Sequence, residues 1–248
     1  MSRLFPPRRR KAAAEPAYID LSDPPVRVAL NVDRRARRFT LRLKNAGHAA
    51  VLTLPPGVPT EAARIFLEEH AGWLARALAK QPQRVVVEPG AVLPVDGCDV
   101  RVVFDPAAPR APRLGDACLR LSPGAPAGPR IAAWLKTRCR NRLAPEVAEY
   151  AEALGRRVTG LAFRDTRSRW GSCTSAGRIS LSWRLAMAPP AVQAYVAAHE
   201  AAHLVEMNHS ERFWALLAEL MPDYAEHRAW LRSEGRALHS YSFEGNAA

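Results

Sequence analysis

The chain has 248 residues, which is enough to bury a substantial core as one large domain or two small ones. It carries 36 Lys and Arg against 24 Asp and Glu, and it contains no run of 18 or more apolar residues, which excludes a membrane-spanning helix. Its four cysteines form no Cys-x-x-Cys pair, so a disulfide scaffold and a thiolate metal site are both disfavoured and a cytoplasmic protein is predicted.

The N-terminal half is predicted to be rich in strands. Residues 1–18 are rich in Pro, Arg and Ala without periodicity, so a disordered basic tail is expected there. Alternating apolar residues at 26–32, 39–43 and 50–54, separated by turn-forming residues, predict an antiparallel meander. Residues 60–63 then open a predicted helix with a suitable cap, and apolar residues at helical spacing continue it over 63–80.

Short strands punctuated by Gly and Pro are predicted next, at 85–87, 91–95, 100–104 and 118–121. The stretch 122–129, rich in Pro, Ala and Gly, is the best candidate for a domain boundary. We therefore expect a β-rich N-terminal subdomain with one helix over 19–129, a second domain over 130–238 and a tail over 239–248.

The second half is predicted to alternate helices and strands. A helix is expected over 131–154, where Pro145 can begin a second segment. Residues 158–167 and 178–183 predict a pair of strands, with a turn over 170–177 between them.

The most informative motif, His199-Glu200-Ala201-Ala202-His203, lies in a further predicted helix. Pro189 and Pro190 suit a first helical turn, and residues 191–207 contain no Gly or Pro. Histidines four residues apart project from one helix face, and neutral imidazole is a good zinc ligand. The motif therefore predicts a zinc site, in which Glu200 can reach a water molecule without binding the metal.

A third protein ligand is expected soon after this helix. Three of the seven histidines of the chain fall within His199 to His209, and a turn can fold His209 back over the metal. Ser210 can cap the next helix, 211–221. The alternative third ligand is a glutamate from a following helix, Glu219 or Glu226, but the short connection to His209 favours the histidine.

Several motifs together resemble the YgjP-like metallopeptidase family. The matching segments are Arg169 to Cys173, Ile179 to Leu185, Ala188 to Pro190, His199 to His203 and Asn208 to Trp214. The similarity extends from about Val26 to Arg236. It implies an α+β fold in which an N-terminal strand-rich antiparallel subdomain precedes a zincin-like helical/β metallopeptidase core, related to SprT and Spartan-like proteases. Their His-x-x-x-Phe element corresponds to His209 to Phe213, whereas Ala201 is smaller than the usual family residue.

The residues and the resemblance together predict a zinc metallopeptidase. Zinc would be held by His199, His203 and His209, with one position open to water. Glu200 would act as general base and then pass the proton to the leaving amine.

Contacts with a peptide or protein substrate are also expected. Arg169, Trp170 and Tyr224 are candidates for substrate or oxyanion contacts, although Trp170 equally suits packing beneath the zinc helix. In zincins a strand edge beside the cleft pairs with extended substrate, so one of the strands 158–167 and 178–183 is expected to have that role.

Alternative functions remain open from the sequence. A zinc amidase or deacetylase acting on small molecules would use the same ligands. A nucleic-acid module with structural zinc would require four protein ligands, and the sequence offers three good ones. A DNA-associated protease that digests DNA-bound proteins combines the two ideas.

Positive charge is concentrated in two segments. Residues 1–44 and 130–184 each carry 12 basic and 4 acidic side chains, residues 45–129 are balanced, and residues 185–248 carry 4 basic and 8 acidic ones. Such a distribution permits weak, non-specific nucleic-acid binding, but no DNA-binding motif accompanies it, and an ordinary solvated surface is the favoured interpretation.

Overall fold

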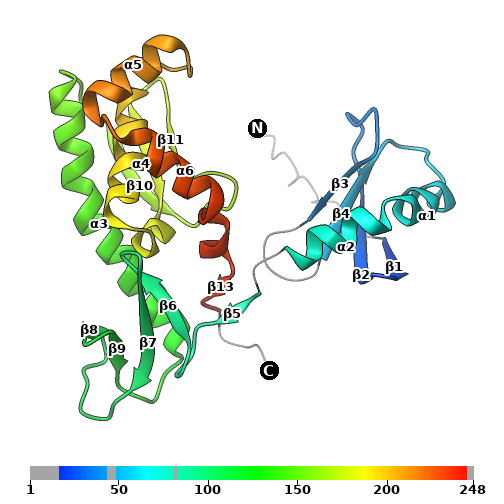
Figure 1. Ribbon diagram of the computed structural model, residues 1–248, viewed down its shortest axis with the longest axis horizontal. Helices are drawn as coiled ribbons and strands as arrows, with labels where there is room; N and C mark the ends of the chain where they lie inside the picture. The colour runs from blue at the N-terminus through cyan, green and yellow to red at the C-terminus, as the bar shows by residue number, and fades with distance from the viewer. Residues whose placement is uncertain (1–16, 44–48, 81–82, 245–248) are drawn as a thin grey trace, which may run out of the picture. The chain divides into compact units, whose positions relative to one another are not determined.

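The computed structural model describes residues 17–43, 49–80 and 83–244, and the chain divides into two compact units (Figure 1). These units are Met1–Gln81 and Pro82–Ala248. The boundary expected between residues 129 and 130 falls inside the second unit. There β9 (Cys118–Leu121) and α3 (Ala127–Ala153) both contribute side chains to one hydrophobic core.

The first unit is a four-stranded sheet with two helices. Its elements are β1 (Tyr18–Ser22), β2 (Pro25–Val32), β3 (Thr40–Leu43), β4 (Ala49–Leu54), α1 (Thr60–Glu69) and α2 (Ala71–Ala79). Most of the expected tail, residues 1–18, lies outside the described residues, but Tyr18 already begins a strand that periodicity did not reveal. The strand order is β1-β2-β4-β3.

The predicted antiparallel meander is wrong for this sheet. β4 lies between β2 and β3, parallel to β2 and antiparallel to β3. The parallel pair sets the buried residues Val28 and Ala50 side by side in the core. Period-two alternation identifies the buried face of each strand but does not tell which strand lies beside it. The predicted meander and the observed strand order therefore fit the sequence equally well.

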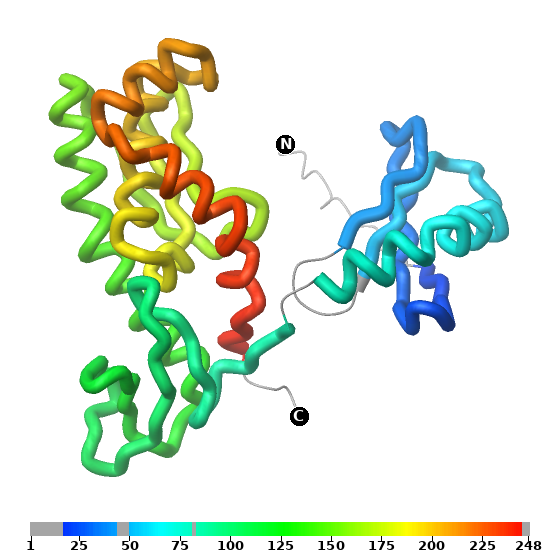
Figure 2. Tube along the Cα trace, in the orientation of Figure 1, coloured from blue at the N-terminus to red at the C-terminus, as the bar shows by residue number. Residues whose placement is uncertain are grey.

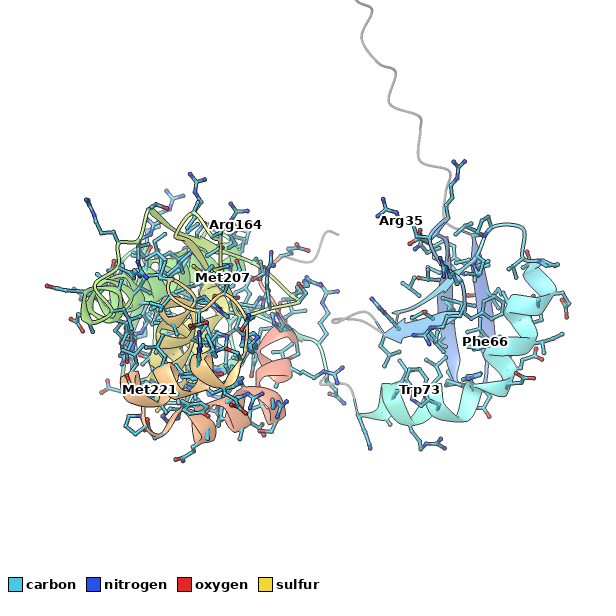
Figure 3. All side chains as sticks on the ribbon, turned by 90° about the horizontal axis from the view of Figure 1, so that it is seen from above. Arg35, Phe66, Trp73, Arg164, Met207 and Met221 are labelled. Atoms are coloured by element: carbon cyan, nitrogen blue, oxygen red, sulfur yellow. The ribbon has the colours of Figure 1, made fainter. Side chains whose placement is uncertain are left out.

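The helix predicted over 63–80 is two helices that meet at His70. His70 leaves the helical conformation (φ −101°, ψ 7°), and its ring stacks on Phe66 with centroids 4.1 Å apart. Phe66 (labelled in Figure 3) also contacts Phe39 edge-on, with ring centroids 5.0 Å apart, and this contact holds α1 against the sheet.

The second unit contains the other elements. In addition to β9 and α3, they are β5 (Val85–Val86), β6 (Val92–Val95), β7 (Cys98–Phe104), β8 (Arg113–Gly115), β10 (Gly160–Arg164), β11 (Gly171–Cys173), β12 (Arg178–Ser182), η1 (Trp183–Met187), α4 (Pro190–Ala202), α5 (Glu211–Leu220), α6 (Tyr224–Ser233), η2 (Gly235–His239) and β13 (Tyr241–Ser242). Together with the first unit they make a mixed α+β protein.

Helices α3 and α4 pack against each other in the core of this unit (Figure 2). α3 runs through Pro145 without a break, so the second segment expected there does not form. Its buried residues Ile131, Leu135, Cys139 and Leu143 follow a four-residue repeat, which gives the helix one continuous apolar stripe.

The strands predicted at 158–167 and 178–183 do pair, as β10 and β12, but they run parallel. The predicted turn between them contains β11, which pairs antiparallel with β12, and the sheet order is β10-β12-β11. Two parallel strands require a long connection between them, and part of this connection forms the edge strand β11.

The expected C-terminal tail, 239–248, is ordered up to residue 244, and 245–248 lie outside the described residues. Tyr241–Ser242 pairs with Val85–Val86, and Phe243 is buried with its ring 5.2 Å from that of Trp183. No helix in the described part of the chain combines the length and the apolarity needed to cross a lipid bilayer.

Candidate active site

The C-terminal end of α4 carries the central histidines. His199 and Glu200 lie in its last turn, and His203 is the residue that ends it, so the helix is shorter than the predicted 191–207. After His203 the chain tightens into a turn, in which the N–H groups of Leu204 and Val205 donate to carbonyl oxygens three residues earlier, at 2.9 and 3.0 Å. His203 Nδ1 lies 2.8 Å from the Glu206 carbonyl oxygen, which can only accept. Nδ1 therefore carries the proton, and Nε2 is left with a free lone pair.

This turn brings His209 back to the helix. Its Nε2 lies 3.1 Å from Nε2 of His199, and the nearest ligand atoms of His199, His203 and His209 are all within 4.8 Å of one another. Zinc bonds of about 2.0–2.1 Å separate two nitrogens by about 3.3 Å around a tetrahedral ion. The three nitrogens therefore have a spacing that suits one small metal ion. In the described part of the chain no other group of three such ligands occurs, and neither Glu219 nor Glu226 belongs to this one.

Aromatic packing holds the three imidazoles. Phe213 of α5 is fully buried, and the centroid of its ring lies 4.5–4.9 Å from those of His199, His203 and His209. Ser210 precedes α5 as expected, but its side chain makes no capping hydrogen bond. Packing by Phe213, rather than a cap, therefore fixes the loop that carries His209.

The electrostatics favour neutral imidazoles. Burial, together with the smaller effects of the charges of His203 and His209, lowers the pKa of His199 to about 3. Burial also lowers the pKa of His203, against the effect of its hydrogen bond to Glu206. Neutral imidazole nitrogens are metal donors, and the negative end of the α4 dipole favours a cation at this position. The donor set therefore fits zinc.

Glu200 lies beside this cluster in a confined position. Only 5% of its surface is exposed, and burial raises the pKa of its carboxyl to about 8, although the charge of Arg169 acts in the opposite direction. A Cβ atom at Gly171 would lie 2.3 Å from Glu200 Oε1 and 2.5 Å from its Cγ. The carboxyl group therefore rests directly on the backbone of β11, where only glycine fits.

The cluster opens into a cavity of about 420 Å³. It is lined by Arg169, Trp170, Gly171, Ser172, Cys173, Tyr195, Val196, His199, Glu200, His203, Met207, His209 and Leu231. Two of the three predicted contact residues, Arg169 and Trp170, are among them, and Trp170 also stacks on His239 with centroids 4.8 Å apart. Tyr224 does not line the cavity but stacks on Trp214, which stacks in turn on His209.

Tyr195 is a cavity residue that the sequence analysis assigned only to the apolar stripe of the helix. It lies one turn before His199, and the two ring centroids are 5.8 Å apart. Burial raises the pKa of its phenol to about 12, so it stays protonated and can donate a hydrogen bond. The four-residue spacing of Tyr195 and His199 indicates that both side chains lie on the same face of the helix, and it could have identified Tyr195 from the sequence. Cys173, also in the cavity, is a protonated thiol because burial raises its pKa to about 11.

The strand along this cavity has a free edge. Ser182 N–H donates to the Trp170 carbonyl oxygen at 2.8 Å, and Thr174 N–H donates to that of Arg178 at 3.0 Å. Alternate residues of β11 therefore bond to β12, and the backbone groups of Gly171 and Cys173 point away from it. β12, one of the two strands expected to pair with substrate, has neighbours on both sides, so the edge at this cavity belongs to β11.

The chain was also compared with known proteins. Residues 37–234 match the family model described as YgjP-like, metallopeptidase domain. No curated protein and no solved structure matches the chain. The matched region includes the three histidines, Glu200 and β11, and it extends over most of the chain. The protein therefore belongs to the YgjP-like metallopeptidase family.

Proposed function

We propose that this protein is a zinc-dependent metallopeptidase that hydrolyses peptide bonds with Glu200 as general base. The observation that carries the proposal is the convergence of three histidines, with ligand atoms within 4.8 Å, beside a buried carboxyl group in an open cavity. His199, His203 and His209 would hold the ion. The chemistry that zinc supplies in such a site is Lewis acidity, which lowers the pKa of water toward neutrality and polarises a carbonyl oxygen.

The protein residues would manage the proton and the substrate. Glu200 accepts the proton of the attacking water and delivers it to the leaving nitrogen, a role for which a carboxyl pKa raised toward neutrality is suited. Arg169 and Tyr195 line the same cavity and can donate hydrogen bonds to the developing oxyanion. Trp170 forms part of the wall that the substrate contacts.

An extended peptide would bind along β11. The backbone groups of Gly171 and Cys173 are directed away from β12, so they can pair with a substrate backbone as an added strand. This edge supports a peptide over a small amide, which has no backbone to pair with it.

The direct test is hydrolysis by the zinc-loaded protein. We expect cleavage of an unfolded protein and of peptides derived from it, abolished by a chelator and restored by zinc. The same preparations are assayed on small acetylated amides. Cleavage confined to the small amides would instead identify an amidase or deacetylase and would contradict the proposal.

Gly171→Ala tests the contact between β11 and the base. The added methyl group would overlap the Glu200 carboxyl, so the base must move. A displacement of this size is expected to lower kcat about 100-fold, while zinc content stays unchanged. The matched control is Gly160→Ala on β10, where the nearest neighbour of the new methyl group is the flexible Arg178 side chain at 3.4 Å. Wild-type kcat in Gly171→Ala would show that this contact does not position the base.

The basic segments 1–44 and 130–184 predict, at most, a weak association with nucleic acid. Binding through phosphates would be independent of sequence and steeply dependent on salt, because it releases counterions from the nucleic acid. Deleting Met1 to Lys11 should weaken such binding and leave peptide hydrolysis intact, because no candidate ligand or base lies there. Salt titrations with single- and double-stranded DNA measure this. If no binding is detected at low salt, the basic residues do not bind nucleic acid and form an ordinary solvated surface.

A further inference from the structure

A second cavity adjoins the candidate active site. It has a volume of about 260 Å³ and is lined by Arg156, Arg157, Thr174, Ser175, Ala176, Gly177, His203, Leu204 and Met207. His203 and Met207 also line the metal cavity, so the two spaces meet at these side chains. Met207 (labelled in Figure 3) is 51% exposed, so its side chain is accessible to a bound molecule.

The chemistry of this second cavity is that of an anion site. Its lining residues include two arginines, Arg156 and Arg157, and two residues with hydroxyl groups, Thr174 and Ser175, and none of them is acidic. Within the described residues, no side-chain hydrogen bond or ion pair engages either arginine. Both guanidinium groups are therefore available, and a guanidinium binds a carboxylate in a bidentate manner.

The two arginines are carried on a well-fixed loop. Thr159, just after them, donates its backbone N–H to the Gly177 carbonyl oxygen at 2.9 Å and its hydroxyl to that of Ala176 at 2.7 Å. These bonds tie the loop after α3 to the turn that follows β11. The backbone that carries the two arginines therefore has a defined position next to the free strand edge.

The position of this cavity and the direction of the bound peptide together determine which part of the peptide reaches it. The metal cavity is lined by residues 169–173, and the second cavity by residues 174–177, directly beyond the C-terminal end of β11. A substrate that pairs antiparallel with β11 runs in the opposite direction. Its residues on the N-terminal side of the scissile bond therefore approach the arginines.

We infer, on the basis of the proposed peptidase activity, that Arg156 and Arg157 form a specificity subsite for an acidic side chain on the N-terminal side of the scissile bond. A cavity of about 260 Å³ has room for a Glu or Asp side chain. The substrate class is thus an extended, acidic segment of a polypeptide.

The test is cleavage-site profiling of a proteome-derived peptide mixture with the zinc-loaded wild type and the double variant Arg156→Glu/Arg157→Glu. Matched peptides that differ by Glu or Gln at the selected position then give kcat/KM. We expect a preference for Glu of about 10-fold in the wild type, the size of a charge-assisted hydrogen bond. The variant should lose it and favour Lys.

The control is Arg164→Glu, which makes at one position the charge reversal that the double variant makes at two. Arg164 (labelled in Figure 3) is an exposed residue of β10 that lines neither cavity. This variant should retain the wild-type preference. An equal loss of the preference for Glu in Arg164→Glu would show that the preference depends only on the net charge of the protein, and it would overturn the subsite.

Other outcomes are equally decisive. Cleavage without an acidic preference, or a preference unchanged in the double variant, would refute the subsite and leave the peptidase intact. A requirement for a free C-terminal carboxylate, lost on amidation, would mean that the substrate runs parallel to β11 and that the cavity holds its chain end, and it would overturn the side-chain subsite. Arginine-dependent binding of an oligonucleotide without any change in peptide preference would assign the pair to nucleic acid. If the zinc-loaded wild type cleaves no peptide, the proposed function is wrong and the subsite falls with it.

Discussion

Glu200→Gln is expected to retain about one zinc per chain and to lose peptide hydrolysis, with kcat falling by about 10²–10⁴-fold. Glutamine keeps the size and shape of the side chain, so it still fits against Gly171. Its amide oxygen, however, cannot take up the proton of the attacking water. The measurements are metal analysis and initial rates on one peptide substrate.

Glu219→Gln is the matched control. Glu219 is exposed on α5 and does not belong to the histidine cluster, so this variant should keep both zinc and activity. Loss of zinc from a folded Glu200→Gln protein would make Glu200 a ligand. Full activity in that variant would remove it from the reaction.

His209→Ala is expected to cause the second large effect, a loss of zinc affinity of more than about 100-fold together with loss of hydrolysis. Removing a ligand should cost more than removing the hydrogen-bond partner of a ligand, which typically costs 10- to 100-fold. The remaining pair, His199 and His203, lies at the end of one helix and cannot complete a three-ligand site alone. Competition with a chromogenic chelator gives the zinc affinity of each variant.

His227→Ala provides the comparison for that measurement. His227 lies on α6, outside the histidine cluster, and its Nε2 is 3.0 Å from Asp223 Oδ2. Its loss should leave zinc affinity at the wild-type value. Wild-type zinc affinity in His209→Ala would show that another group, such as Glu219 or Glu226, completes the site.

The parts of the site that are local in sequence could be predicted. Helical geometry places His199 and His203, four residues apart, on the same face of the helix. The short connection then limits how far His209 can lie from them. The end of α4 at Ala202 could not be foreseen, because residues up to Met207 have adequate helix propensity. The helix ends where the N–H groups of Leu204 and Val205 bond three residues back and the His203 ring binds the Glu206 carbonyl oxygen.

Features that depend on strand neighbours could not be predicted. The alternation of β2, β3 and β4 identified their buried faces, but periodicity carries no information on which strand pairs with which. β11 lies within a segment predicted to be a turn, because its three residues are too few to show alternation. The contact of Gly171 with Glu200 joins residues 29 positions apart and becomes visible only in three dimensions.

The central claim is that the zinc is catalytic and held by three histidines. A crystal structure of the zinc-loaded protein, with the metal identified by anomalous diffraction, tests it most directly. We predict zinc bonded to Nε2 of His199, His203 and His209 at about 2.0–2.1 Å, with the fourth position facing the cavity and free of protein ligands. A fourth protein ligand, such as the Cys173 thiolate or the Glu200 carboxylate, would make the site structural and would contradict this account.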